Sequence, residues 1–187
     1  MLGFCEVDLK HVLPPVLLAA VYPLMKRVSS YPQLVLAFSI ALCVPMGWIT
    51  VAGEIADQDR AMIWVLELAV VAWVLGFDCC YALQDAKADE KAGVKSLVLT
   101  VGFRWIKVVV AALMVVAVGC IGVAATWCRM GWAVTAVIGL WGASLVVMMK
   151  TLDVEKPETG GKVFRWNIMI GGLLSVAYMF ELVVSGL

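Results

Sequence analysis

Long blocks of apolar residues are the feature that most limits what this chain can fold into. A helix needs about 17–25 predominantly apolar residues to cross the hydrocarbon core of a bilayer. Five blocks meet this requirement with at most one charged residue each: Gln33–Ala52, Ala61–Phe77, Val108–Trp127, Trp132–Met149 and Ile168–Leu187. These blocks read as bilayer spans, so the sequence predicts an all-α, polytopic transmembrane helix bundle.

A sixth block near the start of the chain is shorter. Val12–Met25 has 14 residues, and Pro14-Pro15 would kink a helix here or delay its start. We therefore expect five to six spans. The whole chain is 64% hydrophobic, against about half in a soluble domain, and no linker divides it. Residues 1–187 should form a single membrane domain.

The distribution of charge predicts how the bundle is oriented. Net charge is zero, and we expect no nucleic-acid partner. If the spans alternate in direction, the loops after the first, third and fifth share one side and hold most of the basic residues: Lys26, Arg27, Lys87, Lys91, Lys95, Arg104, Lys107, Lys150, Lys156, Lys162 and Arg165. The positive-inside rule places those loops in the cytoplasm or the mitochondrial matrix. We expect a bacterial or mitochondrial inner membrane.

The stretch behind the third span is unusually rich in charge. If a helix continues through it, Asp78, Tyr81, Asp85 and Asp89 recur every three or four residues and share a face. Two carboxylates one turn apart repel each other unless a cation lies between them, and Mg²⁺ prefers such oxygen ligands together with phosphates. Gly93 should end the helix. The alternative is an ordinary solvated helix end.

Three motifs in this sequence resemble those of one enzyme family. Residues 78–96 read Asp-x-x-Tyr-Ala-x-Gln-Asp-x-x-x-Asp-x-x-x-Gly-Val-Lys-Ser, which resembles the second aspartate-rich motif of the UbiA-type intramembrane aromatic prenyltransferases. Residues 22–34, with Tyr-Pro-Leu-Met-Lys-Arg and Tyr-Pro-Gln-Leu, are similar to the family's loop between its fourth and fifth helices. Residues 164–171 resemble the start of its last helix. The strings Tyr-Ala-x-Gln-Asp and Gly-Val-Lys-Ser resemble those of the 4-hydroxybenzoate polyprenyltransferase branch.

This resemblance implies a function and a role for each motif residue. It implies Mg²⁺-dependent transfer of a polyprenyl group from polyprenyl diphosphate to the ring of 4-hydroxybenzoate, a step of ubiquinone biosynthesis. By this resemblance, Asp85 and Asp89 would be Mg²⁺ ligands, and Lys26 and Lys95 would bind phosphate. Arg27 would bind the carboxylate of 4-hydroxybenzoate. Asp78 and Tyr81 would line the catalytic cavity. Asp78, Tyr81 and Arg27 are the catalytic candidates.

One family motif is missing from the sequence. The first aspartate-rich motif, Asn-Asp-x-x-Asp-x-x-x-Asp, is not found, and the chain would begin at the family's fourth helix. We therefore expect a partial UbiA-like bundle whose metal site is incomplete in this chain alone. Three explanations stay open: a truncated reading frame, a shortened relative, or a half that needs a partner chain. A non-catalytic membrane protein that keeps the family fold is the alternative function.

Other residues support different readings less strongly. Glu67 and Glu181 lie within predicted spans, and intramembrane carboxylates would also fit a proton-coupled transporter. The cysteines show no C-x-x-C spacing, so we interpret them as small apolar packing residues. Residues 153–161, which contain Pro157 and two glycines, are predicted to be a turn.

Overall fold

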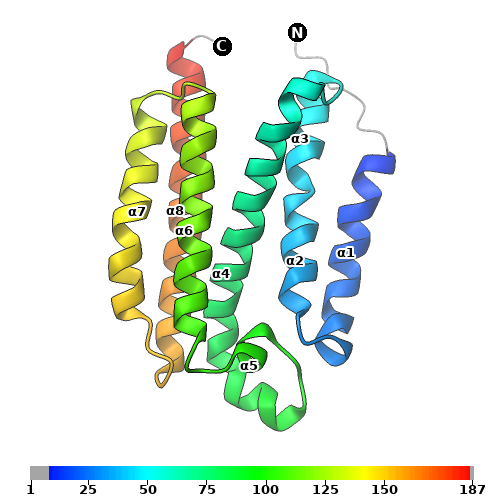
Figure 1. Ribbon diagram of the computed structural model, residues 1–187, viewed down its shortest axis with the longest axis vertical. Helices are drawn as coiled ribbons and strands as arrows, with labels where there is room; N and C mark the ends of the chain where they lie inside the picture. The colour runs from blue at the N-terminus through cyan, green and yellow to red at the C-terminus, as the bar shows by residue number, and fades with distance from the viewer. Residues whose placement is uncertain (1–8, 186–187) are drawn as a thin grey trace.

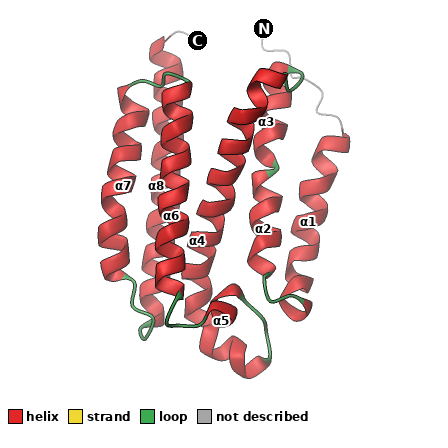
Figure 2. Ribbon diagram, in the orientation of Figure 1, coloured by secondary structure: helices red, strands yellow, loops and turns green. Residues whose placement is uncertain are grey.

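The computed structural model describes residues 9–185, which form helices joined by short loops (Figures 1 and 2). No strand occurs within this range. The elements in chain order are α1 (Leu9–Val28), α2 (Pro32–Ala41), α3 (Cys43–Ala52), the 3-10 helix η1 (Asp57–Asp59), α4 (Arg60–Ala92), α5 (Leu97–Val101), α6 (Ile106–Trp127), α7 (Trp132–Thr151) and α8 (Pro157–Ser185).

The prediction of a transmembrane helical bundle is confirmed. In residues 9–185, five helical stretches are long and apolar enough to cross a membrane, beginning at Pro32, Asp57, Ile106, Trp132 and Pro157. The first of these is not one straight helix, because it is divided at Leu42 into α2 and α3. The sequence pattern did not predict that break.

The short sixth block also forms a helix, although it is not among those five stretches. Helix α1 runs through Pro14, Pro15 and Pro23 without ending. It packs against α2 at the edge of the bundle, as Figure 1 shows. Leu13, with 47% of its surface exposed, is one of several apolar side chains that α1 leaves uncovered.

The helices alternate in direction, so the predicted basic loops share one end of the bundle. Figure 1 shows the α1–α2 loop, the end of α4 with α5, and the α7–α8 loop together at the lower end. We call this the basic end. Both ends of the described chain lie at the opposite end of the bundle, which carries few basic residues.

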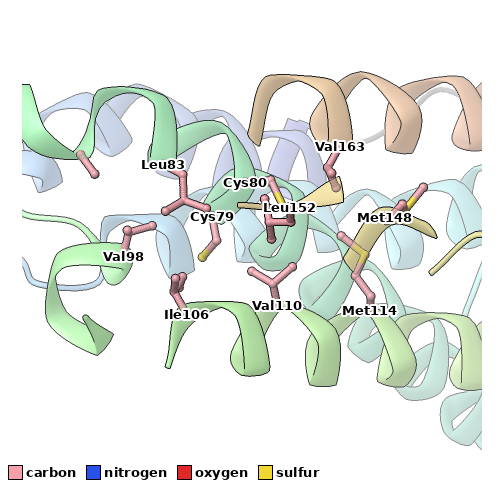
Figure 3. Packing of buried hydrophobic residues seen from close by; sticks show 11 residues of the cluster. Cys79, Cys80, Leu83, Val98, Ile106, Val110, Met114, Met148, Leu152 and Val163 are labelled. Atoms are coloured by element: carbon pink, nitrogen blue, oxygen red, sulfur yellow. The ribbon is translucent and has the colours of Figure 1, made fainter. Parts of the chain in front are cut away.

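Helix α4 is the centre of the fold and packs against α2, α6 and α8. Its core, shown in Figure 3, contains Cys79 and Cys80, which are fully buried against Val110 and Met114 of α6 and Leu152 after α7. Cys79 and Cys80 thus have the predicted packing role, whereas Cys43 and Cys128 are exposed. Cys5 lies outside the described residues. Gly76 brings α6 close, since a Cβ there would lie 2.7 Å from the Cε atom of Met114.

The predicted turn at residues 153–161 is wrong in its second half, because α8 begins at Pro157. Proline is well suited to a first helical turn, where its missing N–H costs nothing. Gly160 and Gly161 then lie within α8 against α4, where a Cβ on Gly160 would collide with the carbonyl oxygen of Cys80. Small residues at such a contact let two membrane helices approach closely.

Glu181 has a structural partner at the far end of the bundle. Its carboxylate accepts hydrogen bonds from the backbone N–H of Gly131 at 2.7 Å and of Val134 at 2.8 Å. These N–H groups begin α7 and have no partner within that helix. The carboxylate therefore caps α7. This contact gives Glu181 a structural role, so its position within a span no longer needs a proton-coupled transporter to explain it.

Candidate functional site

Two segments that the sequence analysis singled out are bonded together at the basic end. The backbone N–H of Lys95 donates to the carbonyl oxygen of Lys26 at 3.0 Å. The Lys95 ammonium lies 3.5 Å from the carbonyl oxygen of Val28. The Thr100 hydroxyl donates to the carbonyl oxygen of Ser30 at 3.1 Å. The α1–α2 loop and the α4–α5 loop thus form one polar unit.

Gln33 is the side chain that fixes this unit to the bundle. It lies in the first turn of α2, is 1% exposed, and accepts a hydrogen bond at 2.9 Å from the backbone N–H of Leu97. Leu97 begins α5, whose N-cap residue Ser96 accepts from the N–H of Leu99 at 3.3 Å. Residue 33 belonged to a family motif, but its type and spacing gave no sign of this contact.

The end of α4 is shaped as predicted. The helix continues unbroken through the charged stretch to Ala92, and Gly93 adopts a left-handed conformation with φ 69° and ψ 18°. The N–H groups of Gly93 and Val94 close the last turn on the carbonyls of Glu90 and Asp89, the usual glycine-ended C-cap. This turn directs the chain to Lys95 and its contact with the α1–α2 loop.

Three carboxylates share one face of α4. At about 100° per residue, Asp78, Asp85 and Asp89 lie within about 40° of one another around the helix. Asp78 is buried at 7% exposure, Asp89 is half-buried, and Asp85 is exposed. Asp78 is thus enclosed by the bundle, whereas Asp85 and Asp89, nearer the basic end, are more accessible.

Asp85 and Asp89 offer oxygen ligands of the kind that Mg²⁺ prefers. Neither Asp85 nor Asp89 forms an ion pair with a basic side chain of the described residues, so both carboxylates are free to bind a cation. No group of three metal-ligating side chains occurs in residues 9–185. Mg²⁺ is commonly held by one or two carboxylates, with phosphates and water completing its shell. The residues present therefore fit Mg²⁺ only together with phosphate.

Asp78 lies in a cluster with residues of α1. Tyr22 of α1 is half-buried, and burial, followed by the nearby charges of Asp78 and Tyr81, raises the pKa of its phenol to about 12. The Lys26 ammonium lies 5.6 Å from the centre of the Tyr22 ring and interacts electrostatically with Asp78. The structure therefore brings Lys26, Asp78 and Tyr81 together, with Tyr22 as a fourth member that was not predicted.

The remaining predicted residues are placed differently. Lys95 is tied to Lys26 through its backbone, with its side chain exposed. Arg27 is exposed, and no hydrogen bond or ion pair joins its side chain to another described residue. The structure thus brings all of the predicted site residues to one end of the bundle but leaves Arg27 outside the cluster around Asp78.

A row of aromatic rings leads away from this cluster along α4. The Tyr81 ring is 5.3 Å from Phe164 of α8, and Phe164 is 5.6 Å from Phe77. Phe77 is 5.6 Å from Trp73, which is 5.5 Å from Trp141 of α7. The row thus connects the polar cluster with the apolar interior of the bundle.

Trp73 is held in place by two residues of α8. Its indole N–H donates to the Asn167 side-chain oxygen at 3.3 Å, and the fully buried Asn167 amide donates to the carbonyl oxygen of Val163 at 2.9 Å. A Cβ on Gly171 would collide with the Trp73 ring. Only glycine therefore leaves room for the indole at this position.

An apolar groove of about 380 Å³ opens beside this row, between α2, α4 and α8. Its lining includes Ile40, Trp73, Phe77, Ile168 and Gly171. Phe77 lines the groove and contacts Phe164, which contacts Tyr81, so the row of rings connects the groove with the polar cluster. The arrangement can hold a ligand with an anionic head at the basic end and an apolar tail along the groove.

Comparison with known proteins identifies the family. The model of the UbiA prenyltransferase family matches residues 10–169, which is most of the chain. The protein therefore belongs to the UbiA prenyltransferase family. The motif residues 22–34 and 78–96, which the structure joins, both lie within the matched range.

Individual relatives agree with this family. The chain is 33% identical to a polyprenyl transferase of Penicillium terrestre over 92% of its own length and 53% of the relative's. It is 32% identical to a 4-hydroxybenzoate solanesyltransferase of Synechocystis over 86% of its length and 53% of that protein. A 4-hydroxybenzoate octaprenyltransferase of Vibrio cholerae is 39% identical over 98 residues. The chain spans about half the length of the curated relatives that cover most of it. No solved structure matches it.

Proposed function

We propose that this chain forms the diphosphate-binding part of a prenyltransferase, which transfers a polyprenyl group from polyprenyl diphosphate to the ring of 4-hydroxybenzoate. The observation that carries the proposal is the junction of the two motif loops through Lys26 and Lys95. It gathers basic side chains and free carboxylates at the basic end, and the row of aromatic rings leads from there to an apolar groove; this arrangement matches a diphosphate joined to an isoprenoid tail.

In this proposal, Asp85 and Asp89 hold Mg²⁺ when the diphosphate is bound. The metal supplies positive charge that neutralises the diphosphate as a leaving group. Lys26 and Lys95 add two point charges for phosphate oxygens from the joined loops. The two pairs would be complementary, because the carboxylates would hold the cation and the lysines would bind oxygens of the diphosphate.

The neighbouring residues would receive the two organic groups. The prenyl tail would lie in the groove along Phe77 and Trp73, where the apolar lining excludes water from the reacting carbon. Asp78 and Tyr81, at the boundary between groove and polar cluster, would face the aromatic acceptor as catalytic residues. Arg27 is the proposed ligand for the benzoate carboxylate, since a planar guanidinium matches that group, and it would have to turn inward when the acceptor binds.

The rest of the active site would come from outside this chain. Two carboxylates from one helix leave most of the coordination shell of the metal open. A further segment or a partner chain carrying the family's first aspartate-rich motif would complete it. We place the assembled enzyme in a bacterial or mitochondrial inner membrane, with the basic end in the cytoplasm or matrix and with a role in ubiquinone biosynthesis.

Product formation tests this proposal. The chain is expressed in membranes without their own prenyltransferase and supplied with Mg²⁺, labelled 4-hydroxybenzoate and a polyprenyl diphosphate, with and without a co-expressed segment carrying the first motif. We expect labelled prenyl product with that segment and none with the Asp85→Asn/Asp89→Asn variant. Well-folded chain that yields no product in either arrangement would favour the alternative, a non-catalytic membrane protein that retains the family fold.

A further inference from the structure

A second groove lies on the other side of the central helix, between α6 and α7. It has a volume of about 440 Å³, within the range of about 300–1,000 Å³ typical of small-molecule sites. Met114 and Leu145 line its inner part, and Val115 and Val146, which are 62% and 59% exposed, line its outer part. The groove therefore opens towards the lipid that surrounds the bundle.

Both charged residues of this groove lie at one end and are lysines. Lys107 is in the first turn of α6 and Lys150 is in the last turn of α7. No carboxylate of the described chain is among the lining residues. The groove thus has a cationic head region and an apolar body.

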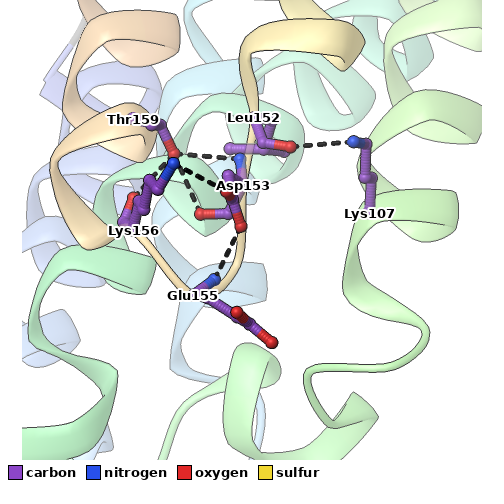
Figure 4. A network of polar contacts seen from close by, with 6 residues as sticks. All are labelled: Lys107, Leu152, Asp153, Glu155, Lys156 and Thr159. Atoms are coloured by element: carbon purple, nitrogen blue, oxygen red, sulfur yellow. Dashed lines mark hydrogen bonds and ion pairs between the residues drawn. The ribbon is translucent and has the colours of Figure 1, made fainter.

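Lys107 is fixed in position by the end of α7. Its ammonium donates to the carbonyl oxygen of Leu152 at 2.8 Å, as Figure 4 shows, and two of its three N–H bonds remain free. Asp153, which follows Leu152, is engaged elsewhere, because its oxygens contact the N–H of Glu155 at 3.0 Å and the ammonium of Lys156 at 3.8 Å (Figure 4). Lys107 is therefore left available for an anion.

The lysines lie at the level of the membrane surface. Trp105 precedes α6 and is 56% exposed, with the guanidinium of Arg104 5.4 Å from its ring centre. Exposed tryptophan and arginine side chains are typical of the interface between hydrocarbon and water. An anion bound by Lys107 and Lys150 would therefore lie among the lipid head groups.

We infer that this groove binds one anionic phospholipid, with its phosphate between Lys107 and Lys150 and an acyl chain between α6 and α7. Basic pockets between membrane helices are suited to such head groups. This site is separate from the proposed diphosphate site. Met114 of the groove packs at Gly76 of α4, whereas Asp78 is about 200° further around that helix. The inference does not depend on the proposed function.

Native mass spectrometry of the full chain in mild detergent tests the inference, with phosphatidylglycerol and phosphatidylcholine as probes. Lys150→Gln should weaken phosphatidylglycerol binding about fivefold, the effect of one charge near a lipid surface, and leave phosphatidylcholine unchanged. Lys162→Gln is the matched control, since Lys162 is exposed on α8 and does not line the groove. Ala111→Phe fills the groove, keeps both lysines, and should also displace the lipid.

Three results would overturn the inference. The first is that Lys150→Gln binds phosphatidylglycerol as tightly as the wild type does. The second is that Lys162→Gln loses as much phosphatidylglycerol affinity as Lys150→Gln. The third is that Ala111→Phe binds phosphatidylglycerol as tightly as the wild type does. The last would mean that phospholipid is attracted by surface charge alone. Circular dichroism of each variant confirms that the helices are retained, and Lys150→Arg should restore binding because it restores the charge.

Discussion

The backbone N–H of Lys95 donates a 3.0 Å hydrogen bond to the carbonyl oxygen of Lys26. Lys26 lies in the last turn of α1, and Lys95 follows the long central helix α4. A single backbone contact therefore sets the spacing between two basic residues proposed to bind the same diphosphate. If the proposal is correct, the residues that hold this contact in place should be required for the structure of the site.

Gln33 should be required for the junction of the two loops. Gln33→Leu removes the acceptor of the Leu97 N–H and leaves a largely buried donor unpaired, so we expect a loss of about 1–3 kcal/mol in the free energy of unfolding. Hydrogen exchange should accelerate at residues 95–99. Gln33→Glu retains an acceptor oxygen and should be milder. Gln58→Leu is the control, because Gln58 is exposed at the other end of the bundle. Equal effects at both glutamines would contradict this role.

Gly171 should be required for the position of Trp73. Gly171→Ala places a methyl group against the indole, and overpacking of this kind costs about 1–3 kcal/mol. Gly172→Ala is the matched control, since its Cβ would meet nothing within 4 Å, and it should be neutral or stabilising by up to about 1 kcal/mol. Tryptophan fluorescence and thermal unfolding measure both effects. An unchanged spectrum and stability for Gly171→Ala would show that the groove is less tightly packed than described.

Tyr22 should ionise at unusually high pH. Its pKa is raised to about 12 by burial and by the charges of Asp78 and Tyr81, whereas an unfolded tyrosine ionises near pH 10. Because the folded-state pKa is the higher one, the stability contributed by Tyr22 is complete below about pH 10 and is lost as the pH rises from about 10 to 12. Subtracting the ultraviolet titration of Tyr22→Phe from that of the wild type should isolate this transition. A difference curve centred near pH 10 would place Tyr22 outside the cluster.

Glu181 should affect stability rather than transport. Glu181→Ala removes the cap of α7, and the loss of a cap costs about 0.5–2 kcal/mol. Glu54→Ala, at an exposed residue of the α3–α4 connection, is the control and should be neutral. Thermal unfolding tests the stability effect. Proton uptake by vesicles that vanishes in Glu181→Ala without a change in stability would instead support the transporter reading.

Much of the fold follows from local sequence pattern. Apolar blocks predicted five spans because the length of a span depends only on bilayer thickness. The end of α4 was predictable because Gly93 adopts a left-handed conformation at no steric cost. The turn predicted at 153–161 was partly wrong, because the contact of Gly160 with the Cys80 backbone outweighs the low intrinsic helix propensity of glycine.

The assembly of the site was less predictable. The motif residues Lys26, Asp78, Asp85, Asp89 and Lys95 could be chosen by type and by family resemblance. The contacts of Gln33 with Leu97 and of Asn167 with Trp73 could not, since each joins segments far apart in the sequence. Such contacts are set by the packing of α2 and α8 on α4, and the pattern of residues within one segment does not predict them.

Magnesium-dependent binding of a polyprenyl diphosphate tests the central claim most directly. Titration calorimetry of the detergent-solubilised chain, with Mg²⁺ or with EDTA, should show binding only with the metal. Asp85→Asn/Asp89→Asn should lose at least about 10- to 100-fold in affinity, the usual effect of groups that merely orient metal ligands. Asp57→Asn/Asp59→Asn, at the opposite end of the bundle, should bind as the wild type does. Equal affinity in EDTA, or an equal loss in the two double variants, would contradict a diphosphate site at the junction of the two loops.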